Sequence, residues 1–163
     1  MKTKEILDKY RKILAPILEC QEEEVEFYIR GRGETPQDKQ IVDKIGELTY
    51  QKNSNWSLGT YIVKCKNQEV STWKLYELPH CCAFMVSCNV NVLPAFRNKR
   101  IGTILNLLRQ DIGRALGYSA VLCTDVEHNV NQRKLLATNG WKDIHSIVNK
   151  RTQNRVYLSV INI

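Results

Sequence analysis

The sequence predicts a mixed α/β fold in one domain of 163 residues, with a central β-sheet flanked by helices. The order of patterns is the first observation that predicts it: helical spacing comes first, strand-like runs follow, and strands and helices then alternate. The second observation is an apolar strand, an amphipathic helix and another buried strand in direct succession over residues 81–127, which is typical of a parallel crossover. Neither an internal repeat nor a second domain is apparent.

The N-terminal part, residues 1–58, is predicted to be mainly helical. Apolar residues recur at helical spacing over residues 4–19, and Pro16 within this pattern predicts a kink or a break near Ala15. A second helix is expected over residues 37–50, after a loop rich in glycine and proline. Residues 51–57 are a polar connector to the predicted sheet core, residues 59–163.

Strand patterns begin at residue 59. Residues 59–66 and 69–78 flank Asn67-Gln68, which predicts a β-hairpin. Residues 81–92 form a third strand. Its alternation predicts one face with Val86, Cys88, Val90 and Val92 and an opposite face with Ser87, Asn89 and Asn91.

The C-terminal half alternates helix and strand. An amphipathic helix is predicted from Ile101 to Leu116 and is closed by Gly117. A buried strand follows over residues 119–127, and a short helix runs from Asn129 to Asn139. Two strands, over residues 141–149 and 155–162, complete the predicted fold.

Composition restricts the compartment and the partner. Apolar residues make up 43% and charged residues 25%, and no apolar run approaches the roughly 18 residues that a membrane span needs. The charged N-terminus lacks a signal-peptide core, and the six cysteines follow no disulfide spacing, so we expect a cytoplasmic protein. The net charge of +7 favours an anionic partner: a phosphate-bearing cofactor, a nucleic acid or an acidic protein.

Residues 90–108, VNVLPAFRNKRIGTILNLL, have the physical features of a phosphate site. A strand ends near Pro94 and a helix begins a few residues later, which exposes the unpaired amides of the first helical turn. Arg97, Lys99 and Arg100 add positive charge there, and Gly102 allows close approach. The segment matches neither the P-loop pattern nor the dinucleotide-binding glycine pattern.

This segment resembles the acyl-CoA pyrophosphate motif of the GNAT acetyltransferases. The family motif follows an apolar strand and has Gln or Arg, two residues, Gly, one residue, and Gly or Ala before a helix; here it is Arg97-Asn98-Lys99-Arg100-Ile101-Gly102. About 25 residues later, DVEHNVNQRKLLATNGW resembles a second family motif, with Asn129 before a short helix that ends in Gly140-Trp141. The resemblance implies the GNAT acyl-CoA N-acyltransferase fold and acetyl-CoA as the acyl donor.

The resemblance also implies roles for particular residues. Backbone amides near Val90 and Val92 would bind the pantetheine arm, and Asn129 would contact its cysteamine end. The pyrophosphate would be held by seven consecutive amides, those of Arg97, Asn98, Lys99, Arg100, Ile101, Gly102 and Thr103.

Two departures from the family pattern bear on binding and catalysis. The family usually has glycine where Arg100 stands, so Arg100 either adopts a strained positive φ or keeps an ordinary conformation and adds charge for the phosphates. Many members have a tyrosine four residues before the second-motif glycine, where it protonates the leaving thiolate; this chain has Leu136.

Acetyl transfer to an amine also needs a base. The strand segment 85–88, where some relatives have a carboxylate, contains none. Glu127 is the predicted base because it ends a strand where the acceptor cleft is expected; the alternatives are Glu77, His80, Asp125 and His128. No metal is predicted, since the consecutive residues His80, Cys81 and Cys82 cannot easily converge on one tetrahedral ion.

The sequence therefore predicts an N-acetyltransferase that moves an acetyl group from acetyl-CoA directly to a primary amine. The sequence does not choose the acceptor, which is a protein amine, an aminoacyl-tRNA, a polyamine or a small metabolite. It does not choose the oligomeric state either, and a homodimer is one option. The main alternative is a non-catalytic module that binds acyl-CoA or nucleic acid on the same fold. A weaker alternative is a transferase that modifies nucleic-acid bases.

Overall fold

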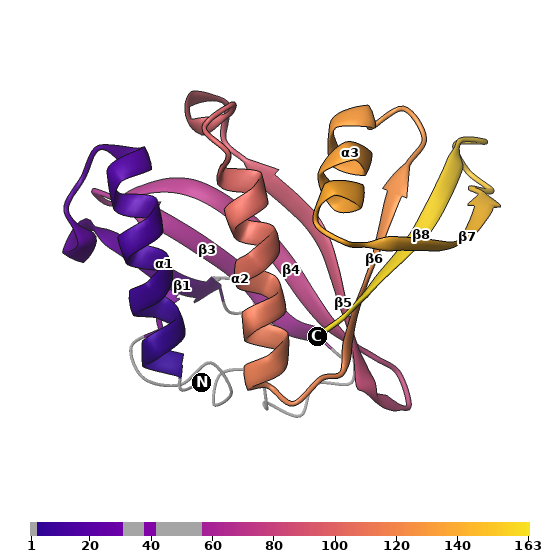
Figure 1. Ribbon diagram of the computed structural model, residues 1–163, viewed down its shortest axis with the longest axis horizontal. Helices are drawn as coiled ribbons and strands as arrows, with labels where there is room; N and C mark the ends of the chain where they lie inside the picture. The colour runs from indigo at the N-terminus through magenta and orange to yellow at the C-terminus, as the bar shows by residue number, and fades with distance from the viewer. Residues whose placement is uncertain (1–2, 31–37, 42–56) are drawn as a thin grey trace.

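The computed structural model describes residues 3–30, 38–41 and 57–163, and it forms one mixed sheet covered by helices (Figure 1). The described residues form eight strands in the spatial order β2-β1-β3-β4-β5-β6-β8-β7. The strands are β1 (Val25–Arg30), β2 (Asp38–Gln40), β3 (Ser57–Cys65), β4 (Gln68–Leu78), β5 (Cys81–Val92), β6 (Ala120–Val126), β7 (Lys142–Val148) and β8 (Arg155–Asn162). The helices are α1 (Thr3–Leu18), α2 (Ile101–Ala115) and α3 (Val130–Thr138), with 3₁₀ turns η1 (Glu22–Glu24) and η2 (Pro94–Phe96). The predicted mixed α/β fold is confirmed.

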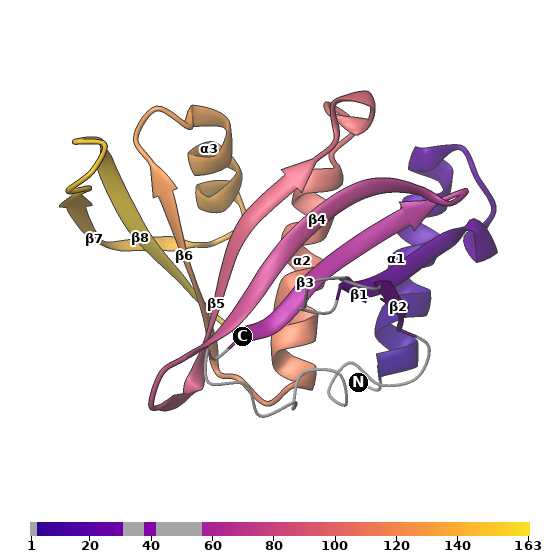
Figure 2. The same cartoon turned by 180° about the vertical axis from the view of Figure 1, so that it is seen from behind.

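Helices α1 and α2 lie side by side across one face of the sheet (Figure 1). Figure 2 shows the sheet from the opposite side, with both helices behind it. Their apolar stripes are buried as helical spacing predicts, with Leu14 of α1 and Leu105 and Leu108 of α2 fully covered. The core between these helices and the sheet includes Phe27, Trp73 and other aromatic and aliphatic side chains. This layer fixes the start of α2 relative to the end of β5.

Strands β5 and β6 are parallel neighbours that pair along only a short segment. The register joins Phe84–Val86 to Ala120–Leu122, and the two strands diverge beyond it (Figure 1). The β6-facing edge of β5 is therefore not covered by β6 after Val86. An unpaired strand edge of this kind presents backbone donors and acceptors to a ligand.

A β-bulge in β5 overturns the predicted alternation of that strand. Thr72 and Lys74 of β4 are two residues apart, but their partners Asn91 and Cys88 are three apart, so β5 contains one extra residue. Asn89 in this segment has a φ of 53°.

The extra residue shifts the alternation by one position. Before the bulge the buried residues are Met85 and Ser87, and after it Val90 and Val92 pack against the core. Val86 and Cys88 therefore do not share a face with Val90 and Val92, and that prediction was wrong.

The N-terminal part differs from the mainly helical prediction. Helix α1 is present, but Pro16 does not break it: the helix continues to Leu18. Strand β1 joins β3 in the sheet, and Asp38–Gln40 forms β2 where the second helix was predicted to begin. The rest of that predicted helix, residues 42–50, lies outside the described residues.

The remaining elements confirm the sequence predictions. The β3–β4 hairpin is present, but its turn is at Lys66 and Asn67, one residue earlier than the predicted Asn67-Gln68; their φ values of 50° and 63° are typical of a type I′ turn. Gly117 follows α2 with a φ of 86°, a conformation that favours glycine. Strand β6, helix α3 and the β7–β8 hairpin lie within two residues of their predicted limits.

Candidate functional site

A cavity of about 370 Å³ lies at the N-terminus of α2 and contains most of the predicted cofactor-binding residues. Its lining combines the end of β5, the η2–α2 loop and the start of α3. Of the ten predicted residues, all except Lys99 line it: Val90, Val92, Arg97, Asn98, Arg100, Ile101, Gly102, Thr103 and Asn129. Residues from two separate motifs, about 30 positions apart in sequence, therefore face one space.

The backbone of this loop leaves amides available to an anion. The first bonds of α2 run from the Thr103 and Ile104 amides to the carbonyl of Arg100, at 3.0 and 3.2 Å. The Arg97 amide donates to the carbonyl of Pro94 at 3.2 Å. The amides at both ends of the predicted run, Arg97 and Thr103, are thus engaged within the protein. Ile101 and Gly102 precede the first intrahelical bond, so their amides are oriented as an anion-binding helix N-terminus requires.

Arg100 has a left-handed backbone, with φ 61° and ψ 10°, at the N-cap of α2. This decides between the two alternatives for the position: Arg100 has the conformation that glycine adopts without strain. A non-glycine residue in this region costs roughly 1–2 kcal/mol. The side chain is exposed and still brings its charge to the cavity that it lines.

The other cations of the loop differ in position. Arg97 Nε donates to the carbonyl of Val92 at 2.9 Å, which holds this side chain against the end of β5. Lys99 does not line the cavity; its Nζ lies 3.9 Å from Glu19 Oε1 at the end of α1. Positive charge at the cavity mouth therefore comes from Arg97 and Arg100.

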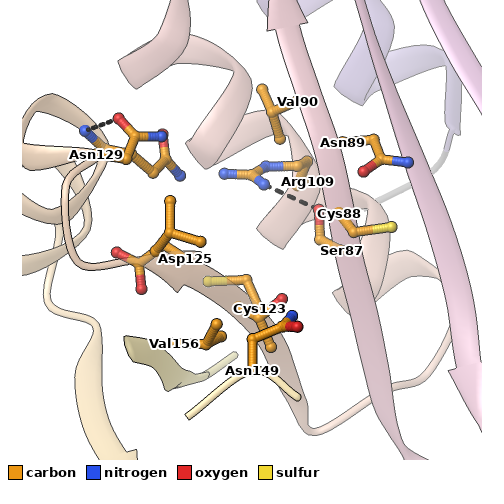
Figure 3. Close-up of a pocket in the computed structure, with 13 residues that line it drawn as sticks. Ser87, Cys88, Asn89, Val90, Arg109, Cys123, Asp125, Asn129, Asn149 and Val156 are labelled. Atoms are coloured by element: carbon orange, nitrogen blue, oxygen red, sulfur yellow. Dashed lines mark hydrogen bonds between the residues drawn. The ribbon is translucent and has the colours of Figure 1, made fainter. Parts of the chain in front are cut away.

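A second cavity, of about 340 Å³, lies between the diverging parts of β5 and β6 (Figure 3). It shares Val90, Asn129 and Gln132 with the first cavity, so the two adjoin. Together they form a path from the N-terminus of α2 into the space between the two strands. Asn129 caps α3 by accepting a bond from the Gln132 amide at 3.3 Å, which fixes it at this junction.

The position where many relatives have a tyrosine is a core position here. Leu136 is 2% exposed and packs in the hydrophobic core. Its side chain has no proton to donate to a leaving thiolate. Any proton for that thiolate must come from solvent or from another group.

The candidate bases occupy different environments. Glu127, the predicted base, is exposed just after β6, and its amide donates to the carbonyl of Arg155 at 2.9 Å; it lines neither of the two cavities. Asp125, one of the alternatives, is 6% exposed and lines the cavity between β5 and β6. Burial raises the pKa of the Asp125 carboxyl, the neighbouring Asp143 raises it further, and Arg133 lowers it. Asp125 Oδ1 accepts no hydrogen bond from any residue that the structure describes.

A buried arginine in the same cavity was not among the predicted site residues. Arg109 of α2 is 1% exposed and lines the cavity between β5 and β6. The sequence does contain a signal for it, because Arg109 falls on the apolar stripe of α2, between Leu105 and Ile112 at helical spacing. A charged residue on a buried face predicts either a partner or a ligand.

No metal site is formed by the part of the chain that the structure describes. Cys82 is exposed next to the half-buried Cys81, and all six cysteines are free thiols. Burial raises the pKa of the Cys123 thiol to about 12, which disfavours the reactive thiolate. Among the described helices, none has the length and apolar character needed to cross a membrane.

Comparison with known proteins finds similarity in structure but not in sequence. No protein-family model matches the chain, and no curated protein matches it. Solved structures do match the chain in fold. An IAA acetyltransferase from Bacillus cereus is 16% identical with a TM-score of 0.56, over 66% of this chain and 79% of that one.

Two further solved structures contain the cofactor or an analogue of it. A Salmonella typhimurium protein solved with its cofactor acetyl-CoA is 13% identical, with a TM-score of 0.53 over 64% of both chains. An Arabidopsis thaliana protein in complex with the bisubstrate analogue CoA-Ac-MVNAL is 16% identical, with a TM-score of 0.56 over 64% of this chain and 74% of that one. The chain therefore has the fold of the GNAT-family acetyltransferases.

Proposed function

We propose that this protein is an N-acetyltransferase that moves an acetyl group from acetyl-CoA to a primary amine in the cytoplasm. The observation that carries the proposal is the cavity at the N-terminus of α2. It brings together all of the cofactor-binding residues predicted from two motifs except Lys99, and it opens onto a second cavity between β5 and β6. The similarity in fold to acetyltransferases supports the same reaction class.

In the proposed complex, the diphosphate of acetyl-CoA lies at the first turn of α2. The amides of Ile101 and Gly102 donate to it, and Arg97 and Arg100 supply positive charge. The pantetheine arm extends along the edge of β5 that β6 leaves uncovered, near Val90 and Val92. This route takes the thioester past Asn129 into the cavity between β5 and β6.

The reaction is a direct acyl transfer. The neutral amine attacks the thioester carbon, a C–N bond forms, the C–S bond breaks, and the nitrogen loses one proton to a base. Glu127 is the base proposed from the sequence, and Asp125 is a second candidate because it lines the cavity and has a raised pKa. The CoA thiolate takes its proton from solvent, since Leu136 offers none.

A second candidate function is a module that binds acyl-CoA, or nucleic acid, without turnover. Leu136 is the observation that favours it, because the usual acid is replaced by a buried aliphatic side chain. The exposed Arg97 and Arg100 are compatible with either anionic ligand.

Release of free thiol from acetyl-CoA tests the proposal. The full chain is incubated with acetyl-CoA and a panel of polyamines, amino acids, aminoacyl-tRNA and peptide amines, and the free thiol is measured against time. Release above the buffer rate with at least one amine supports the enzyme. Saturable binding of acetyl-CoA without release of free thiol in the presence of any of these amines supports the module instead.

A further inference from the structure

The cavity between β5 and β6 contains a buried cation to which none of the described residues supplies an acidic partner. Arg109 Nη1 donates to Ser87 Oγ and Nη2 donates to Asn106 Oδ1, both at 2.9 Å. Both acceptors are neutral, and Arg109 Nε has no hydrogen-bond partner in the part of the chain that the structure describes. A charged side chain that is taken out of water without a counter-ion costs several kcal/mol, so its presence in a buried position needs an explanation.

Neighbouring groups hold the guanidinium in one orientation. Asn106 Oδ1 also accepts a bond of 3.0 Å from Trp141 Nε1, and the Trp141 ring centroid lies 6.0 Å from Arg109 Cζ. Figure 3 shows the guanidinium projecting from α2 into the space between Ser87 and Asn129. Burial lowers the pKa of Arg109 to about 10, which leaves it charged at neutral pH.

The cavity is charged at two points, and its other lining residues are polar but neutral or apolar. Among the described residues that line it, only Arg109 and Asp125 have charged side chains. Asp125 lies near Arg133 and Asp143, which both influence its pKa. A fixed, buried guanidinium suits a singly charged anion, and its planar donor pattern matches a carboxylate.

We propose that this cavity binds a carboxylate group of the substrate through Arg109. The assignment to a substrate rests on the proposed function. The carboxylate has two sources in such a reaction: the far end of a dicarboxylic acyl chain carried by CoA, or the carboxylate of an amino-acid acceptor. In the second case the acceptor amine lies toward Asp125, at the other charged point of the cavity.

Two pairs of probes separate these sources. Succinyl-CoA and butyryl-CoA have four-carbon acyl chains and differ in the terminal carboxylate, so calorimetric titration with each tests the acyl source. L-amino acids and their amides differ in the same way, and titration with each pair tests the acceptor source without needing CoA. The carboxylate member of one pair is expected to bind at least about tenfold more tightly, as a charge-assisted hydrogen bond provides.

Variants assign the preference to Arg109. Arg109→Gln should abolish it, and Arg109→Lys should retain part of it because the charge is kept without the fork geometry. Free CoA is the control for folding, since the α2 N-terminal cavity that would bind it does not contain Arg109.

The outcomes distinguish this inference from the proposed function. If CoA binds and neither pair shows a carboxylate preference, the inference is overturned and the proposed function stands. If CoA does not bind but amino acids bind more tightly than their amides in an Arg109-dependent way, the proposed function fails and the carboxylate site stands. A preference that survives Arg109→Gln also overturns the inference.

Discussion

Lys9 Nζ of α1 lies 2.7 Å from Asp111 Oδ2 of α2, and Tyr10 Oη donates to the same oxygen at 2.8 Å. Arg114 Nη1 contacts the other carboxylate oxygen, Oδ1, at 2.7 Å. Asp111 is 7% exposed, so these contacts join two helices around a nearly buried charge. The contacts of Lys9 and Tyr10 with Asp111 hold α2 against α1, and the N-terminus of α2 forms the candidate cofactor site.

Asp111 should make stability depend on pH. Burial alone would raise the pKa of this carboxyl, but the hydrogen bonds from Lys9 and Tyr10 and the nearby charges lower it below the ordinary aspartate value. A lowered folded-state pKa gives stability that is present above the unfolded-state pKa and lost as pH falls through the folded one. Asp111→Asn should therefore reduce the free energy of unfolding at pH 7 by about 1–3 kcal/mol, with the difference shrinking in acid. Urea unfolding of both proteins between pH 7 and pH 3 measures this, and a difference that does not change with pH would contradict it.

Gly102→Glu should abolish acetyl-CoA binding, because a carboxylate at this position repels the diphosphate and fills the first turn of α2. Gly102→Ala is the matched control. A Cβ at Gly102 would lie 3.3 Å from Leu135 Cδ1, the flexible end of a side chain, and the backbone has no positive φ there. The alanine variant should fold and bind within about tenfold of the original protein. Equal binding by the glutamate variant would remove this segment from the cofactor site.

Arg100 allows charge and backbone strain to be measured separately. Arg100→Gly and Arg100→Ala both remove the charge, so both should weaken acetyl-CoA binding and reduce its salt dependence. Only glycine relieves the left-handed backbone, so the glycine variant should be about 1 kcal/mol more stable than the alanine variant. Thermal unfolding compares the two, and equal stability would mean that Arg100 carries no backbone strain.

Substituting each candidate base separately tests which of them takes the proton from the amine. If Asp125 is the base, kcat/KM of the original protein should rise with pH through a raised pKa, because only the ionised carboxylate accepts a proton. Asp125→Asn should then remove this limb and lower the rate roughly 100-fold, with acetyl-CoA affinity unchanged. If the exposed Glu127 is the base instead, Glu127→Gln should lower the rate, with acetyl-CoA affinity unchanged. A loss in neither variant would exclude both residues from proton transfer.

The parts of the fold that depend on local patterns were predictable from the sequence. Helical periodicity predicted the limits of α2 to within one residue, and the turn residues predicted the β3–β4 hairpin. The two motifs named nine of the residues that line the α2 N-terminal cavity. The helix and the hairpin depend on contacts within a short stretch of chain, whereas the cavity residues were named by the resemblance of the two motifs to a known family.

Features that depend on distant contacts were not predictable. Strand β1 is short and follows an acidic segment, and it is a strand because β3 pairs with it along six residues. The β5 bulge depends on register with β4, and nothing in the alternation of residues 86–92 indicates it. The environment of Arg109 requires Ser87 and Trp141, which lie 22 residues before it and 32 residues after it in the chain.

Calorimetric titration of the full chain with acetyl-CoA, with Gly102→Glu and Gly102→Ala titrated alongside, shows whether the start of α2 binds the diphosphate. We expect saturable binding with one ligand per chain, kept by the alanine variant and lost by the glutamate variant. A flat titration of the folded, unmutated protein up to millimolar acetyl-CoA would contradict the claim that the start of α2 binds the diphosphate.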